Sequence, residues 1–452
     1  MKFFSIFSRE TGVSVLASTS KDVRLLMFMR MVRMMAFGQT SLILALFLKE
    51  LGVEEKLIGV FMTSTLLGDV LISYFVTLYA DRLGRRNVLI GGAALMTTSG
   101  LVFAWSSNYY VLVLASIIGV ISPGGNEIGP FRAVEESSLA HLLPLEERAD
   151  VYAWYALLGS LGMALGSLSG GWLIETSRRQ LGAGVLESYR YLFALYSIMG
   201  VIKLTATSLL TKRVELEPES IQVDNTNTND DTRPLLERAQ SGDNRNAAPK
   251  PKWAVLPPLS PESRKIVVLL SWLFAMDSFA SSMASFSWLT YYIAKKFSAS
   301  INEGQLGTIF FVTGVIASVA TLGGSAISRR LGPLLTMVIT HLPSSTLLAL
   351  IPLPSSLTFT LVILIARSCT SSMDIAPRQS FLSAVVLKEE RTAVMGWVNV
   401  VKTLAQAFGT LVTGDLTGKG MQWLAFVIAG SLKVAYDLGI LATFINVKLH
   451  EH

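Results

Sequence analysis

Long apolar segments recur along the whole chain and are separated by short polar intervals. A helix needs about 20 mostly apolar residues to cross a bilayer, and twelve segments of this sequence meet that requirement. They begin near Val23, Leu57, Val88, Tyr110, Val151, Tyr191, Ile266, Gln305, Leu334, Leu357, Ala393 and Trp423. The pattern predicts an all-α polytopic membrane protein with 12 transmembrane helices in two groups of six.

A long polar interval separates the sixth apolar segment from the seventh. It is rich in Asn, Asp, Arg and Pro and poor in aromatic residues, a composition that cannot form a packed core. We therefore expect a disordered cytoplasmic linker between two six-helix bundles. The predicted parts are a cytoplasmic N-terminal segment 1–22, an N-terminal bundle 23–211, the linker 212–265, a C-terminal bundle 266–447 and a cytoplasmic tail 448–452.

The distribution of Lys and Arg predicts which side of the membrane holds the termini. An even number of spans puts both termini on one side, and cytoplasmic loops carry an excess of basic residues. Basic residues gather in the linker and after the second and eighth spans, at Arg82, Arg85, Arg86, Arg329 and Arg330. Arg178, Arg179 and Arg190 lie on the other side. The balance predicts cytoplasmic termini.

The composition agrees with a membrane protein and argues against other classes. Hydrophobic residues make up 51% of the 452 residues and charged residues 15%, whereas soluble domains carry about 25% charged residues. The net charge of +6 is explained by the orientation of membrane helices rather than by nucleic acid binding. The single cysteine, Cys369, excludes an internal disulfide.

Four features of the first half recur in the same order in the second half. Two are short segments, EERADVYAW with EERTAVMGW and GSLSGGWL with GTLVTGDL, each pair 243 residues apart. The others are a Leu-Gly pair and a Lys in the sixth and twelfth spans. The matching positions are 146–154 with 389–397, Gly166 with Gly409, Gly84 with Gly332, and Lys203 with Lys433. Matching positions fall on the same side of the membrane, so the repeat is parallel, about an axis along the membrane normal.

Two motifs of the first half resemble signatures of the major facilitator superfamily. The loop after the second span reads Ala80-Asp81-Arg82-Leu83-Gly84-Arg85-Arg86, close to that superfamily's loop 2–3 signature, with Thr77 where a Gly is usual. The fifth span carries Gly162-x3-Gly166-Ser167-x2-Gly170-Gly171, which has the spacing of the antiporter branch's glycine signature, with Ser167 in place of its Pro. The resemblance covers nearly the whole chain. It implies a fold of two pseudo-symmetric six-helix bundles and transport of a small solute.

The fourth span departs from the family pattern. It has no Arg at the depth where proton-coupled drug exporters of the superfamily carry one. Pro123, Gly124 and Gly125 interrupt it, as Pro377 interrupts the tenth span. Interrupted helices at matching places in two halves point to the binding region of a transporter. The alternative is a simple proline kink.

The loop 2–3 motif predicts a latch on the cytoplasmic side. Asp81 ends the second span, where it can meet the positive N-terminal end of a helix in the opposite bundle. The arginines of the motif can pair with acids at the inner ends of helices when that side closes. The residues of this predicted latch are Asp81, Arg82, Gly84, Arg85, Arg86, Glu135 and Glu136, with Asp150 as a further acid. A positive-inside topology signal is the alternative interpretation.

Helix packing is the role we expect for the glycines of the fifth span. Small residues four apart allow close approach of helix backbones in membranes. Gly162, Gly166, Gly170 and Gly171 are therefore expected to pack tightly, against a helix of the other bundle.

Ionisable residues inside the spans are the main candidates for function, because they are costly in a membrane. In the superfamily fold, spans 1, 4, 7 and 10 line the central cavity, and these spans hold most of the intramembrane charge. Their charged residues are Arg30, Arg33, Glu127, Arg132, Glu135, Glu136, Asp277, Arg367, Asp374 and Arg378. The others are Asp69, Lys203, Lys402, Lys433 and Asp437. Lys433 and Asp437, four residues apart on one helix, are expected to neutralise each other.

Two roles are open for the carboxyl groups near mid-membrane. Glu127, Asp277 and Asp374, with Asp69 beside them, could hold and release a proton as access alternates. Alternatively they form fixed ion pairs, for instance Glu127 with Arg30 or Arg33, and Asp374 with Arg378. Arg30 and Arg33 facing the cavity would favour an anionic substrate group. His341 is expected to be a helix-packing residue.

The sequence thus predicts a secondary active transporter, coupled to protons, that moves a small organic solute by alternating access. A passive facilitator of the same fold is the alternative, and a transporter-like receptor is a further one. A membrane enzyme is not expected, because the four His residues form no catalytic pattern with acids. No phosphate-binding loop of the form G-x4-G-K-[ST] occurs, so nucleotide is not an expected partner.

The remaining expectations concern location and partners. We expect a monomer in the lipid bilayer, in the plasma membrane or in a vacuolar or lysosomal membrane, with no cofactor and no metal. In the linker, Asp231, Leu235 and Leu236 fit an acidic dileucine sorting signal.

Overall fold

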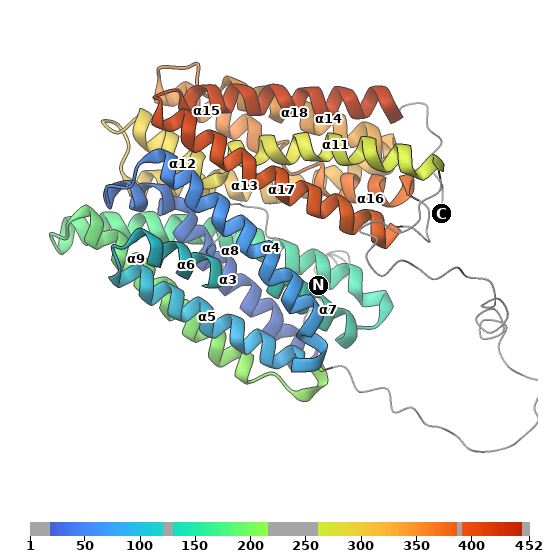
Figure 1. Cartoon of the computed structure of the whole chain (residues 1–452), viewed down its shortest axis with the longest axis horizontal. Coiled ribbons are helices and arrows are strands. Elements are labelled where there is room, and N and C mark those ends of the chain that lie inside the picture. The colour runs from blue at the N-terminus through green and yellow to red at the C-terminus, as the bar shows by residue number, and fades with distance from the viewer. Residues whose placement is uncertain (1–18, 120, 122–129, 216–260, 387–390, 445–452) are drawn as a thin grey trace, which may run out of the picture.

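The protein consists of two helical bundles that lie side by side (Figure 1). The computed structural model describes residues 19–119, 121, 130–215, 261–386 and 391–444. Within these ranges the secondary structure is helical, without strands. The predicted fold class, an all-α membrane protein with two pseudo-symmetric six-helix bundles, is confirmed.

Each predicted span is occupied by one helix or by two shorter helices in succession. The N-terminal bundle contains α3 (Lys21–Glu50), α4 (Glu55–Leu83), α5 (Arg85–Trp105), α6 (Tyr109–Gly119), α7 (Pro130–Leu142), α8 (Leu145–Gln180) and α9 (Val185–Ser208), followed by the 3-10 turn η1 (Lys212–Val214). The C-terminal bundle contains α11 (Pro261–Met283), α12 (Phe286–Lys296), α13 (Glu303–Leu331), α14 (Pro333–Leu350), α15 (Leu357–Ser368), α16 (Ile375–Val385), α17 (Arg391–Gly418) and α18 (Gln422–Phe444).

Three spans are divided into two helices. The fourth span comprises α6 and α7, the seventh α11 and α12, and the tenth α15 and α16. In the tenth span the division is the turn 369–374, and Pro377 lies in the first turn of α16, where its missing N–H costs no helical hydrogen bond. Pro377 therefore follows the interruption instead of causing it. Pro123, Gly124 and Gly125 lie outside the described residues.

The repeated Leu-Gly pairs occupy equivalent turns in the two bundles. Gly84 separates α4 from α5 with φ +86°, and Gly332 separates α13 from α14 with φ +79°. Only glycine adopts this left-handed backbone without a steric cost. The sequence repeat therefore marks a repeated structural turn.

Glycines allow the two bundles to touch at one end. A Cβ atom on Gly59 of α4 would lie 2.9 Å from Cα of Gly414 of α17, and one on Gly171 of α8 would lie 3.0 Å from Cα of Gly307 of α13. Both distances are too short for a side chain, so the two helix pairs are in direct backbone contact.

The glycines of the fifth span divide between two partners. Gly162, Gly166 and Gly170 lie against Met31, Met35 and Gln39 of α3, within the same bundle. Gly171 faces the other bundle. The expected partner was therefore wrong for three of the four glycines, because α8 packs against α3 along most of its length.

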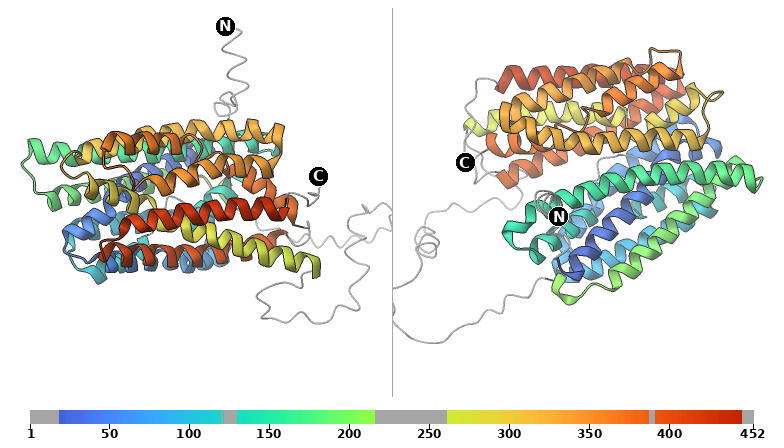
Figure 2. Two further views of the ribbon diagram at one scale, coloured as in Figure 1. Left: turned by 90° about the horizontal axis from the view of Figure 1, so that it is seen from above. Right: turned by 180° about the vertical axis from the view of Figure 1, so that it is seen from behind.

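Polar contacts between the bundles gather at the same end as the interface glycines. Ser287 of α12 donates to the Ser41 carbonyl at 2.9 Å, Thr63 of α4 donates to the Ala407 carbonyl at 2.8 Å, and Arg178 of α8 pairs with Glu303 of α13 at 3.0 Å. From this end the bundles diverge toward the end that holds the α4–α5 turn and α16 (Figures 1 and 2).

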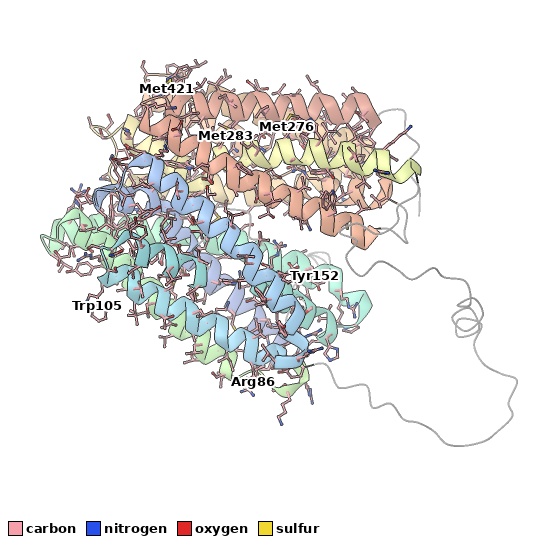
Figure 3. All side chains as sticks on the ribbon, in the orientation of Figure 1. Arg86, Trp105, Tyr152, Met276, Met283 and Met421 are labelled. Carbon is pink, nitrogen blue, oxygen red and sulfur yellow. The ribbon has the colours of Figure 1, made fainter. Side chains whose placement is uncertain are left out.

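Side chains mark the two ends of the N-terminal bundle. Arg86 and Tyr152 lie at the end where the bundles diverge, and Trp105 lies at the opposite end (Figure 3). Arg86 belongs to the basic loop that the charge distribution assigns to the cytoplasm. The bundles are thus apart on the side predicted to be cytoplasmic.

Helical residues occupy both borders of the predicted linker 212–265. Lys212–Val214 form η1, and Thr211 donates through N and Oγ1 to the Asp22 carboxylate at 3.0 and 2.6 Å. At the other border, α11 begins at Pro261 rather than at residue 266, since proline is favoured in the first position of a helix. Asp231, Leu235 and Leu236 lie outside the described residues.

We expect Gly59→Val to destabilise the protein by about 1–3 kcal/mol, because the new side chain must push α4 away from α17. The measurement is the melting temperature of the purified protein in detergent. Gly91→Val on α5 is the matched control, since a Cβ there meets nothing within 4 Å. Equal melting temperatures for the two variants would contradict the close contact.

Candidate functional site

Three side chains converge on Glu135 in the N-terminal bundle. Glu135 belongs to α7 and is fully buried. Its Oε2 accepts hydrogen bonds from Arg33 of α3 and from the Tyr155 hydroxyl of α8, each at 2.6 Å. The Lys203 ammonium of α9 lies 3.2 Å from Oε1. We call Glu135, Arg33, Tyr155 and Lys203 the N-terminal charge cluster.

Arg30 extends this cluster by one helical turn. Its guanidinium carbon lies 4.7 Å from the centre of the Tyr155 ring, a distance at which a cation is attracted to the ring face. The absence of a side chain at Gly159 leaves room for it, because a Cβ there would lie 2.7 Å from Nε of Arg30. Side chains from spans 1, 4, 5 and 6 therefore contact one another in one buried polar cluster.

A second cluster surrounds Asp277 in the C-terminal bundle. Asp277 of α11 is 2% exposed. Its Oδ2 accepts from Arg378 of α16 at 2.7 Å, and its Oδ1 accepts from Lys433 of α18 at 2.7 Å. Arg378 also pairs with Asp374, four residues earlier in the chain. We call Asp277, Arg378, Lys433 and Asp374, together with the two residues described next, the C-terminal charge cluster.

His341 and Asp437 complete the C-terminal charge cluster. Nδ1 of His341, on α14, lies 2.8 Å from Oδ1 of Asp437, on α18. Its other ring nitrogen, Nε2, lies 3.9 Å from Oδ1 of Asp277. The imidazole therefore stands between two carboxylates. Each of its two ring nitrogens faces one of these carboxylates.

The two clusters are related by the internal repeat, but with the charges exchanged. Glu135 and Arg378 are 243 residues apart, which is the repeat offset, and Arg33 and Asp277 are 244 apart. In each bundle one arginine–carboxylate pair joins the first and fourth spans. The arginine is on the first span in the N-terminal bundle and on the fourth span in the C-terminal bundle. Lys203 and Lys433 take equivalent places in the last spans, and each contacts the acid of its own cluster.

Several predicted site residues lie in these clusters. Of the predicted cavity and coupling residues, the structure places Arg30, Arg33, Asp277, Asp374 and Arg378 there. Asp69 of α4 is also buried, at 7% exposed. Glu127 lies outside the described residues. Arg132 pairs with Glu136 at 2.7 Å.

One predicted ion pairing differs from the structure. Lys433 and Asp437 do not neutralise each other, because Lys433 turns to Asp277 and Asp437 to His341. For each residue, a partner on another helix was closer than the partner expected from the sequence. Glu135 contacts Arg33, and Glu136 contacts Arg132.

The loop 2–3 motif has a different acid partner in the structure. The Glu215 carboxylate, just after η1, accepts from the backbone N–H groups of Arg85 and Arg86 at 2.6 and 3.1 Å. These N–H groups belong to the first turn of α5, which has no acid of its own. An acid there satisfies unpaired donors and interacts favourably with the helix dipole.

The side chains of the motif lie at the α4–α5 turn. Arg85 donates to the Ser137 carbonyl at 3.3 Å and Arg86 to the Ser208 carbonyl at 2.7 Å, while Arg82 is exposed. The side chain of Asp81 is outside the described part of the chain. The latch remains a prediction for a conformation in which this side is closed.

Sequence reasoning assigned His341 to helix packing and missed the contact partners of Lys203. The equivalence of Lys203 and Lys433 was a usable signal, since a lysine repeated at the same depth requires an acid in both bundles. His341 gave no such signal, because nothing in the sequence places it beside Asp437, 96 residues away. Among the described residues, no group of His, Cys, Asp or Glu could hold a metal ion.

Comparisons with known proteins agree with this architecture. Residues 26–443 match the family profile of the Major Facilitator Superfamily. The chain is 36% identical over 437 residues to YJR124C, an uncharacterized membrane protein of Saccharomyces cerevisiae, and the match covers 95% of each chain. It is 26% identical over 202 residues to the quinolone resistance protein NorA of Staphylococcus aureus, which is 44% of this chain and 50% of NorA.

Solved structures of transporters have the same fold. The nucleoside transporter NupG superposes with a TM-score of 0.67 at 13% identity, over 95% of this chain and 100% of NupG. The inward-open conformation of the xylose transporter XylE from E. coli superposes with a TM-score of 0.66 at 16% identity, over 94% of this chain and 98% of XylE. At these identities the likeness shows the fold.

We expect Glu135→Gln to cost about 3–5 kcal/mol of stability, because Arg33 and Lys203 then lose their buried counter-charge. The free energy of unfolding in detergent measures this. Adding Lys203→Met to Glu135→Gln should restore part of the loss, since one stranded charge is removed. Glu136→Gln is the matched control, because its ion pair with Arg132 is partly exposed and such pairs contribute about 0–1 kcal/mol.

Proposed function

The chain belongs to the Major Facilitator Superfamily, and on this basis we propose that it is a secondary active transporter that moves a small organic solute across a membrane. Transport proceeds by alternating access and is coupled to protons. The protein is a transporter rather than an enzyme.

The arrangement of contacts supports alternating access. Each charge cluster lies within a single bundle and ties its helices together. The bundles themselves meet through backbone contacts such as Gly59 with Gly414 and through polar contacts at one end. Two internally braced bodies that meet at one end can rock against each other. Divergence on the predicted cytoplasmic side corresponds to an inward-facing state.

The C-terminal charge cluster is the observation that carries proton coupling. Asp277 is held by Arg378 and Lys433, and His341 links it to Asp437. A proton that binds Asp277 removes the negative charge that holds both cations. Protonation and ion pairing therefore compete for one carboxylate. The competition gives a physical route by which proton binding loosens the contact between α11, α16 and α18.

A passive facilitator is the alternative, in which the same ion pairs are fixed. The two functions differ in whether protons move with the solute. Recording the pH inside vesicles during solute flux separates them, because only a coupled transporter changes that pH.

We expect Asp277→Asn to abolish accumulation driven by a pH gradient while solute exchange continues, because the carboxylate that takes up the proton is gone. The test uses protein reconstituted in vesicles, with solutes first identified by comparing metabolite profiles of cells with and without the protein. Asp415→Asn is the matched control, since Asp415 forms an exposed pair with Lys419 near the end of α17. Full pH-driven accumulation in Asp277→Asn would refute this role.

The linker motif is proposed to determine the membrane of residence. Replacing Leu235 and Leu236 with Ala in a fluorescently tagged protein should shift it from a vacuolar or lysosomal membrane to the plasma membrane, since dileucine signals are read by sorting receptors. Microscopy of the tagged protein measures the shift. The tagged protein with both leucines intact is the reference, and an identical distribution of the two proteins would exclude the signal.

A further inference from the structure

The cationic side chains within the spans of the C-terminal bundle differ in whether a negatively charged side chain lies beside them. Arg378 and Lys433 contact Asp277. The Lys402 ammonium lies 5.7 Å from the centre of the Phe274 ring. In the described ranges, neither an acid nor an aromatic ring accompanies the guanidinium of Arg367.

Arg367 lies near the middle of the membrane. It is in the last turn of α15, which begins at Leu357 directly after the loop at the closed end of the bundles. At 1.5 Å per residue it is about 15 Å along the helix, half of a bilayer core of about 30 Å. Lipid headgroups, which lie at the bilayer surface, are therefore too far away to neutralise it.

Arg367 lies on the face of its span that is directed away from lipid. The exposed apolar residues of α15 are Phe359, Val362 and Ile365. At 100° per residue these lie about 80–160° around the helix from Arg367, whereas Thr360 lies within about 20°. Thr360 is completely buried. Arg367 therefore projects toward the interior of the protein.

Beyond the turn 369–374, the tenth span leads to the C-terminal charge cluster. Asp374 follows Arg367 by seven residues and Arg378 by eleven, spacings that return to the same face of a helix. The chain makes one further helical turn after Arg367, since the N–H of Ser371 bonds to the Arg367 carbonyl at 2.9 Å. Arg367 thus stands about three turns before Arg378 in the tenth span.

The local environment of Arg367 is suited to binding rather than to structure. Its Nε is buried without a hydrogen-bond partner, while the residue as a whole keeps accessible surface. An arginine without a neighbouring negative charge is costly at the centre of a membrane protein. A ligand that supplies the missing negative charge would remove this cost, and a guanidinium fork matches the two oxygens of a carboxylate or phosphate group.

We propose that Arg367 binds an oxyanion group of the transported solute, so that the substrate is an organic anion. This inference rests on the proposed transport function and names the chemical class of its substrate. It also moves the anion site away from Arg33, whose charge is already matched by Glu135.

The test compares untargeted metabolite profiles of cells that produce the wild-type protein, Arg367→Gln, Arg367→Lys, Lys419→Gln or no protein. The solutes that differ between wild-type and protein-free cells should carry a carboxylate or phosphate group, and their identity distinguishes these two sources. Arg367→Gln should reduce the difference to the protein-free level, while Arg367→Lys keeps part of it through the retained charge. Lys419→Gln is the matched control and should resemble wild type, because Lys419 forms an exposed pair with Asp415 outside both charge clusters.

A melting curve of purified Arg367→Gln separates binding from a structural role. Removing a charge that has no partner should leave the melting temperature equal or raise it, whereas loss of a structural contact would lower it. If Arg367→Gln melts lower, or retains the full wild-type profile, the assignment of Arg367 is overturned.

The profiles also separate this inference from the proposed function. If the solutes that differ are neutral or cationic, transport stands and the organic-anion class is refuted. If wild-type and protein-free cells have the same profile, the proposed transport function fails, and this inference fails with it.

Discussion

An unpaired charge inside a membrane is energetically costly, and this cost determines which helices of the protein must stay in contact. In each bundle one fully buried carboxylate, Glu135 or Asp277, is held by an arginine and a lysine from other helices. Removing either acid would strand two cations where water cannot solvate them. Spans 1, 4 and 6 of each bundle must therefore remain close together.

The same constraint explains where the structure can move. Ion pairs brace each bundle from within, whereas the bundles meet at one end through apolar side chains, glycine backbones and a few polar groups, among them the Arg178–Glu303 pair. Backbone contacts through glycine are close but do not interlock side chains. In the alternating access that we propose, the two bundles are the bodies that separate, and each charge cluster moves with its own bundle.

Particular residues show how far the sequence could predict this site. The apolar spans and the parallel repeat gave the fold, and the charges of spans 1, 7 and 10 gave Arg33, Asp277 and Arg378. The pairing of Lys433 with Asp437 was wrong, because neighbours on one helix were preferred over partners across the bundle. His341 was assigned to packing, since its contact with Asp437 joins two helices far apart in sequence. The equivalence of Glu135 and Arg378 was also missed, because the two residues carry opposite charges and a search for repeats looks for similar residues.

By itself the sequence determined the membrane class, the number of spans, the two related halves and the identity of the costly charges. These follow from local composition, because a bilayer fixes how long an apolar helix must be. Only the tertiary structure decided which charge neutralises which, that Glu215 caps α5, and that Arg367 has no partner in the described chain. Electrostatic pairing depends on distances between helices, and those distances are set when the helices pack.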